Sequence, residues 1–143
     1  MTDHIASGDR FHPQCSIREV NSVSALGLAH LGDAVYEILV RSMLVMEGRT
    51  TGAHLHQDTT ALVCAPAQAL AADKLFPLLT EEEQGFFRRG RNAGVKHIPK
   101  NATHTQYSKA TALEALFGAL YLLGRQDRLC QLFDYIMEDS NAT

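Results

Sequence analysis

The feature that most constrains this chain is a long, mostly apolar helical run, ATALEALFGALYLL, from Ala110 to Leu123. It holds a single acid, Glu114, and no charged residue stands three or four positions away on the same helical face. A second isolated acid, Asp33, lies in a similar run, HLGDAVYEILV. We expect both to be buried, where a carboxylate is costly unless something pairs with it. A shared metal ion is the simplest partner and indicates metal-assisted hydrolysis, whereas capped or salt-bridged helix acids are the alternative.

Hydrophobic periodicity predicts an all-α fold of about six to seven helices, because no alternating β pattern or repeat competes with the helical one. Caps and glycine stops set the expected boundaries. The predicted helices run from Ser22 or Ser24 to Ala29, 32–46, 54–63, 66–76, from the Thr80 and Glu83 capping box to about Arg91, 107–123 and 127–138.

Length and composition predict one domain at 17–140, preceded by a flexible, polar N-terminal tail at 1–16. No apolar stretch approaches the roughly 20 residues of a membrane span, and the first residues do not resemble a signal peptide. The three cysteines, Cys15, Cys64 and Cys130, are odd in number and far apart. They form no disulfide framework or metal motif, so we expect a cytoplasmic protein.

Charge is distributed unevenly along the chain. The segment from Gln84 to Leu113 has no acid and six basic residues, whereas the remaining seven basic and sixteen acidic residues leave −9 elsewhere. This layout is typical of a protein that grips a polyanion at one place, the alternative being a solvated, flexible segment. The segment includes a long loop, 92–106, with glycine and proline but no apolar period, and such loops are usually functional or disordered.

Four motifs carry a family resemblance: HLGDAVYE (His30–Glu37), RRGRNAG (Arg88–Gly94), IPKN (Ile98–Asn101) and YSKATALEALFGALYL (Tyr107–Leu122). Together they resemble Mini-ribonuclease III, compact bacterial relatives of ribonuclease III without a double-stranded-RNA-binding domain. The resemblance implies an all-helical homodimer that cleaves double-stranded RNA with Mg²⁺, for which Mn²⁺ can substitute. Each subunit would cut one strand and leave 5′-phosphate ends. The implied substrate is precursor large-subunit (23S) ribosomal RNA, with a ribosomal protein as a candidate assistant.

The resemblance also assigns residue roles. Asp33 matches the acid of the LGDAV motif and Glu114 the acid of the later EAL motif, so both are expected to be catalytic metal ligands. Two further acids of ribonuclease III would fall on Ala29 and Thr111, and Thr111 is expected to support the site. His30 stands where an aromatic, usually tyrosine, packs into the partner subunit, which makes it the expected dimer contact.

The basic segment would contact the RNA, with 92–106 as the contacting loop. The expected RNA-binding residues are Arg88, Arg89, Arg91, Asn92, Lys96, Lys100, Asn101 and Lys109. If all six cations touched phosphates, the logarithm of affinity would fall with the logarithm of salt concentration at a slope of about −5. Duplex RNA is recognised mostly by shape and backbone, which suits such a loop. For Lys109, a solubilising role at a helix start is equally open.

Several alternatives remain at this stage. Glu37 lies one helical turn after Asp33 and could orient a water molecule at the metal, although an ion pair with Arg41 is favoured. His54 and His56 are interpreted as surface helix residues. An inactive RNA-binding or ribosome-assembly module of the same fold competes with the nuclease, but retention of both acids argues against it. A helical interaction protein would leave the basic segment unexplained.

Overall fold

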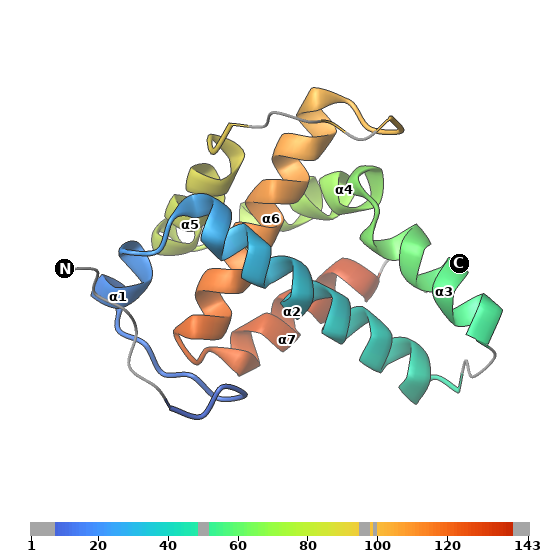
Figure 1. Ribbon diagram of the computed structural model, residues 1–143, viewed down its shortest axis with the longest axis horizontal. Helices are drawn as coiled ribbons and strands as arrows, with labels where there is room; N and C mark the ends of the chain where they lie inside the picture. Colours follow the sequence, from blue (N-terminus) through green and yellow to red (C-terminus); the bar gives the residue numbers. More distant parts are fainter. Residues whose placement is uncertain (1–7, 49–51, 95–97, 99, 139–143) are drawn as a thin grey trace.

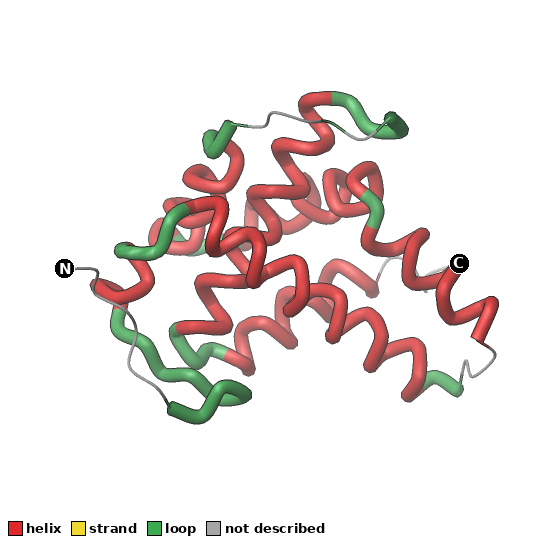
Figure 2. The backbone as a smooth tube through the Cα atoms, viewed as in Figure 1, coloured by secondary structure: helices red, strands yellow, loops and turns green. Residues whose placement is uncertain are grey.

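A computed structural model describes residues 8–48, 52–94, 98 and 100–138, and within these ranges the chain is helical without a strand (Figure 2). The all-α prediction is confirmed. The helices are α1 (Ile17–Asn21), α2 (Ala25–Met46), α3 (Gly52–Val63), α4 (Ala65–Leu75), the short 3-10 helix η1 (Phe76–Leu78), α5 (Glu81–Arg91), α6 (His104–Leu122) and α7 (Gln126–Glu138).

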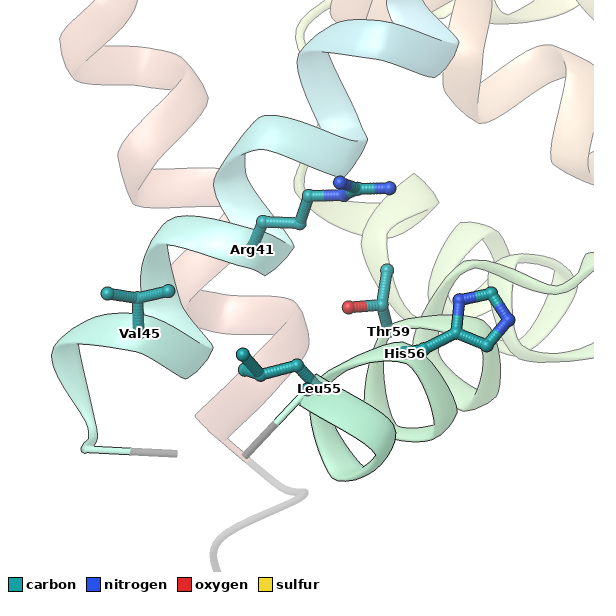
Figure 3. Close-up of a pocket in the computed structure, with 6 residues that line it drawn as sticks. Arg41, Val45, Leu55, His56 and Thr59 are labelled. Carbon is teal, nitrogen blue, oxygen red and sulfur yellow. The ribbon is translucent and has the colours of Figure 1, made fainter. Parts of the chain in front are cut away.

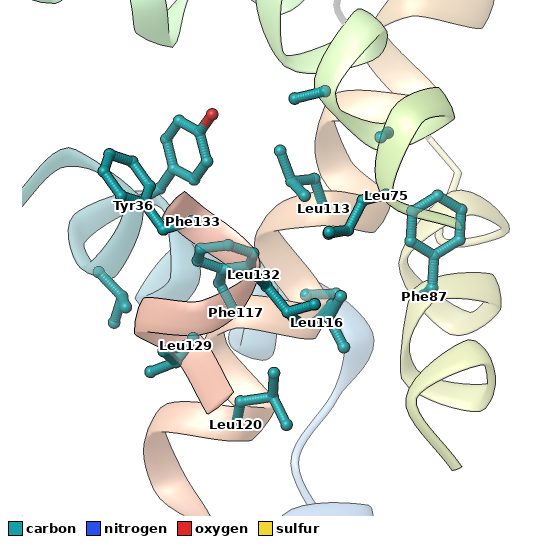
Figure 4. Packing of buried hydrophobic residues seen from close by; sticks show 14 of the residues in the cluster. Tyr36, Leu75, Phe87, Leu113, Leu116, Phe117, Leu120, Leu129, Leu132 and Phe133 are labelled. Carbon is teal, nitrogen blue, oxygen red and sulfur yellow. The ribbon is translucent and has the colours of Figure 1, made fainter. Parts of the chain in front are cut away.

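Helix α6 lies at the centre of the fold and packs against α2, α4, α5 and α7 (Figure 1). Its side chains are buried over 110–113 and again over 115–120, which is nearly the whole circumference of the helix. A helix that is apolar all round is stable only inside a protein, so the other helices cover it. Phe117 is fully buried, and Tyr36 of α2 packs edge-on against it at 5.3 Å between ring centroids (Figure 4).

Two glycines let α2 and α6 cross in direct backbone contact. A Cβ added to Gly32 would lie 1.6 Å from the backbone oxygen of Glu114, and one added to Gly118 would lie 2.0 Å from the backbone oxygen of Leu28. No side chain fits between the helices at either point. The crossing therefore brings the backbone beside Asp33 up to the backbone of Glu114.

The N-terminal part of α2 differs from the prediction. We expected one helix to end at Ala29 and another to begin at Gly32, but the structure has a single helix from Ala25 to Met46. Glycine inside a helix costs about 1 kcal/mol relative to alanine, which is why Gly32 resembled a boundary. The close contact with α6 that only glycine allows outweighs this cost.

The chain before α2 is more ordered than the predicted tail at 1–16. The N–H of Cys15 donates to the backbone oxygen of Leu122 at 2.8 Å, and the hydroxyl of Tyr121 donates to the backbone oxygen of Arg10. These bonds hold residues 10–15 against the end of α6, and the short helix α1, which the periodicity did not predict, follows. Residues 1–7 of the predicted tail lie outside the described part.

The capping box predicted at the start of α5 is confirmed, with Thr80 and Glu83 bonded to each other's backbone N–H groups. Glu83 is 2% exposed and accepts two hydrogen bonds of 2.8 Å from Arg128 of α7. Burial acts to raise the pKa of Glu83, but the bonds from Arg128 and Thr80 outweigh it, so the pKa lies below the usual value. This ion pair ties α5 to α7.

Helix α6 begins earlier than predicted. A second capping box, between Thr103 and Gln106, starts it at His104 rather than at Tyr107, so the loop after α5 is shorter than 92–106. The three cysteines are free thiols. None of the helices in the described ranges is long and apolar enough to cross a membrane.

Candidate active site

The crossing of α2 and α6 brings the two predicted acids together. The side chains of Glu114 and Asp33 lie close enough to interact, although the two residues are 81 positions apart in the sequence. Burial, followed by the charge and hydrogen bond of Asp33, raises the pKa of Glu114 to about 8. Two carboxylates held this close repel each other when both are ionised, and a cation between them would remove the repulsion.

The expectation that both acids are buried is wrong for Asp33. Glu114 is half-buried, but Asp33 is exposed to solvent. The buried face of α2 carries Gly32 and Val35, and Asp33 lies beside that face rather than on it. A solvent-borne ion could therefore reach the pair from the side of Asp33.

A third polar group faces Glu114 from α4, and the sequence reasoning missed it. Gln68 is 2% exposed, and its side chain acts to lower the pKa of Glu114. The two groups do not form a hydrogen bond of regular geometry, because Nε2 of Gln68 is buried without a hydrogen-bond partner in the described structure. In the sequence, Gln68 is a single amide in an alanine-rich helix, APAQALAADKL. No other polar residue repeats at helical spacing with it, so the pattern gave little indication of a role.

The donor set suits a hard divalent cation. Mg²⁺ binds through one or two carboxylates and completes its shell with waters and substrate phosphate oxygens. Asp33 and Glu114 provide two carboxylates, and the described residues contain no cluster of three or more histidine, cysteine, aspartate or glutamate side chains. The Nε2 of Gln68, which is buried without a partner, belongs to a further polar group beside Glu114. The site thus fits an ion that is only partly coordinated by protein.

Glu37 forms the ion pair that we favoured over a role at the metal. Its carboxylate accepts from Arg41 at 3.1 Å on the surface of α2. Arg41 also lines a hollow of about 290 Å³ between α2 and α3 (Figure 3). His54 and His56 are exposed on α3, as predicted.

Thr111 occupies a buried position on α6, one turn before Glu114. Its hydroxyl donates to the backbone oxygen of Tyr107 at 2.9 Å, so it is satisfied within its own helix. Ala29, the other position where ribonuclease III carries an acid, is buried on α2. Thr111 and Ala29 therefore pack near the acids without adding a charge.

The basic residues predicted to bind RNA fall into two groups. Three are engaged with the protein: Arg88 donates to Gln84 at 3.2 Å, Arg89 to the backbone oxygen of Val23 at 2.6 Å, and Lys109 pairs with Asp73 at 2.8 Å. Arg88 is nevertheless exposed, as are four others, the cations Arg91 and Lys100 and the amides Asn92 and Asn101. Lys96 lies outside the described residues. The exposed group is the one best placed to meet a ligand.

Known proteins that are similar to this chain identify its family. The Ribonuclease III domain matches residues 26–125. A Mini-ribonuclease 3 of Symbiobacterium thermophilum is 45% identical over 107 residues, which cover 75% of this chain and 82% of the relative. A Mini-ribonuclease 3 of Enterococcus faecalis is 38% identical over 129 residues, which cover 89% of this chain and 98% of the relative. The chain belongs to the Mini-ribonuclease III family.

A similar fold is found in a crystal structure of a Fusobacterium nucleatum protein. It matches with a TM-score of 0.78 and 31% identity, over 85% of this chain and 98% of that one. The matched domain contains both Asp33 and Glu114. Membership of the Mini-ribonuclease III family confirms the resemblance seen in the four motifs and the activity class that it implied, a double-strand-specific endoribonuclease.

The predicted dimer contact, His30, is exposed on α2. Leu26 is 55% exposed and Ile38 is 59% exposed, and both share the helical face of His30 because they lie four and eight residues away. Large apolar side chains spaced along one exposed helical face are a candidate interface in a Mini-ribonuclease III.

Proposed function

We propose that this protein is a homodimeric endoribonuclease that cleaves double-stranded RNA with Mg²⁺ held by Asp33 and Glu114. Mn²⁺ is expected to substitute. The natural substrate is the precursor of large-subunit (23S) ribosomal RNA, as implied by the four family motifs, and a ribosomal protein is a candidate assistant. The observation that carries the proposal is the convergence of two carboxylates from distant parts of the sequence.

The residues of the chain bind and orient the reactants. When bound, a divalent cation supplies an activated water, neutralises charge on the phosphate and stabilises the leaving oxygen. Asp33 and Glu114 would hold this ion in their ionised forms, and they come from the two helices whose backbones touch at the α2–α6 crossing. The protein needs no general base of its own for this chemistry, which explains why two carboxylates suffice.

The exposed cations and amides at the end of α5 and before α6 support contact with the RNA backbone. Arg91 and Asn92 end α5, whereas Lys100 and Asn101 precede α6. By the rise of a helix, Glu114 lies about 15 Å along α6 from His104. A duplex that contacts this end of α6 and runs along the helix would extend toward Glu114.

A dimer supports cleavage of both strands. The described part of one subunit has one pair of converging acids, so cutting two strands of one duplex calls for a second copy. The exposed face of α2 that carries Leu26, His30 and Ile38 is the surface that we assign to that contact.

The test is cleavage of a labelled RNA duplex with Mg²⁺, with analysis of the product ends and sedimentation of the protein. We expect products with 5′-phosphates, a dimer in solution, and loss of cleavage in Glu114→Gln. Asp134→Asn, which removes an exposed carboxylate from α7, is the matched control and should cleave like the wild type. Duplex binding without cleavage by the wild type, across metals and pH, would instead indicate an inactive RNA-binding module.

A further inference from the structure

Gln68 destabilises the fold in its present position. It lies in α4, which packs against α6, and its side chain is among the most buried of the described residues. Its Nε2 has no hydrogen-bond partner. A buried donor without a partner costs about 1–3 kcal/mol, so an apolar side chain of similar size would suit this position better in the protein as it stands. Stability of the fold therefore does not explain the amide at this position, which points to a functional reason.

The surroundings of Gln68 provide one. Its amide lies near the carboxyl group of Glu114, and Asp33 also interacts with this carboxyl group. A carboxylate has two oxygens, and one can face a cation beside Asp33 while the other accepts a hydrogen bond from an amide. Carboxylates that bind metals are commonly held by such second hydrogen bonds.

We propose that Gln68 is a positioning residue that donates from Nε2 to the ionised Glu114 and holds this carboxylate in its cation-binding orientation. The proposal rests on the metal site of the proposed function. Gln68 acts through Glu114 and touches neither the RNA nor the reacting atoms. The unpartnered Nε2 then destabilises the metal-free protein, and this loss of free energy is offset when Nε2 donates to Glu114 in the metal-bound protein.

If Gln68 positions Glu114, its replacement should change the metal affinity without lowering the stability of the metal-free protein. Loss of such an outer hydrogen bond typically weakens metal binding or activity by about 10- to 100-fold. Replacing Gln68, whose Nε2 is buried without a partner, with an apolar side chain of similar size should leave the metal-free fold as stable as before or more stable. A merely structural glutamine would show the reverse pattern.

The experiment compares Gln68→Met with the wild type and with Gln126→Met. Gln126 has the same defect, a buried Nε2 without a partner, but it starts α7 beyond the far end of α6. Glu114 lies about 12 Å from that end by the rise of a helix. Three properties are measured: Mn²⁺ affinity by calorimetry, thermal unfolding without metal, and the Mg²⁺ concentration for half-maximal cleavage of an RNA duplex.

For Gln68→Met we expect Mn²⁺ affinity to fall by about 10- to 100-fold, with a matching rise in the Mg²⁺ requirement and no loss of metal-free stability. Gln126→Met should bind Mn²⁺ like the wild type. Should Gln68→Met not fold, Gln68→Asn, which withdraws the amide by one methylene, takes its place with the same expected loss of affinity.

Unchanged Mn²⁺ binding in Gln68→Met, while the wild type binds the ion, would overturn the positioning role and leave the proposed function intact. A large loss of metal-free stability with unchanged affinity would show a structural role instead. If the wild type itself binds neither Mn²⁺ nor Mg²⁺, the metal site fails, and the role of Gln68 fails with it.

Discussion

Replacement of Gly32 by alanine should damage both the fold and the active site, because this glycine lies where α2 touches α6. The added Cβ would lie 1.6 Å from the backbone oxygen of Glu114, and ordinary contact begins at 3.4 Å. The helices would have to separate by up to about 1.8 Å, since a backbone atom, unlike the end of a long side chain, cannot turn aside.

The expected free-energy change combines two opposing terms. Overpacking of a well-packed core costs about 1–3 kcal/mol, and a clash with backbone belongs at the upper end of that range. Alanine gains about 1 kcal/mol over glycine inside a helix. The net loss is about 2 kcal/mol, which corresponds to a fall in Tm of roughly 6–8 °C for a chain of this size.

Thermal unfolding and duplex cleavage check this prediction together. Separating the acids by more than an ångström should lower the cleavage rate by about 10²-fold. The control is Gly85→Ala in α5, where an added Cβ meets nothing within 4 Å, and it should stabilise the protein by about 0.5–1 kcal/mol. A Gly32→Ala protein as stable and active as the wild type would refute the backbone contact.

Two further predictions concern charge. Glu83 has a lowered pKa, so its contribution to stability is present above its unfolded value of 4.5 and is lost as pH falls through the folded pKa. Glu83→Gln should therefore lower the unfolding free energy by about 2–3 kcal/mol near neutral pH and flatten its acid decline, as followed by denaturant titration from pH 7 to 3. Removing the exposed charges Arg91 and Lys100 together should reduce the slope of log affinity for an RNA duplex against log salt by roughly 1–2. An unchanged slope, measured by fluorescence anisotropy, would place the RNA elsewhere.

The sequence was sufficient to find the two acids because each is isolated in an apolar run. It was not sufficient to place Asp33 in the fold. The run around Asp33 contains exposed apolar side chains such as Ile38, which made a helix with one buried face resemble one buried all round. Only the packing of α2 on α6 determines which face of α2 is buried and which is exposed.

Other features of the site depend on contacts that leave no local pattern. Gln68 meets Glu114 only because α4 packs on α6, and one amide among alanines has no period that predicts it. Gly32 resembled a helix boundary because glycine disfavours helices, whereas its reason lies in the backbone of α6. Arg89 belongs to a basic segment, yet its guanidinium donates to Val23, which is 66 positions away.

The central claim is that Asp33 and Glu114 form a metal-dependent nuclease site, and Asp33→Asn tests it most directly. The measurement is cleavage of a plain RNA duplex with Mg²⁺ by the wild type and the variant, with duplex binding followed in parallel. We expect the variant to bind like the wild type and to cleave on the order of 10³-fold more slowly or not at all, as loss of several kcal/mol of metal-ion stabilisation implies. Cleavage by Asp33→Asn at the wild-type rate would contradict the account.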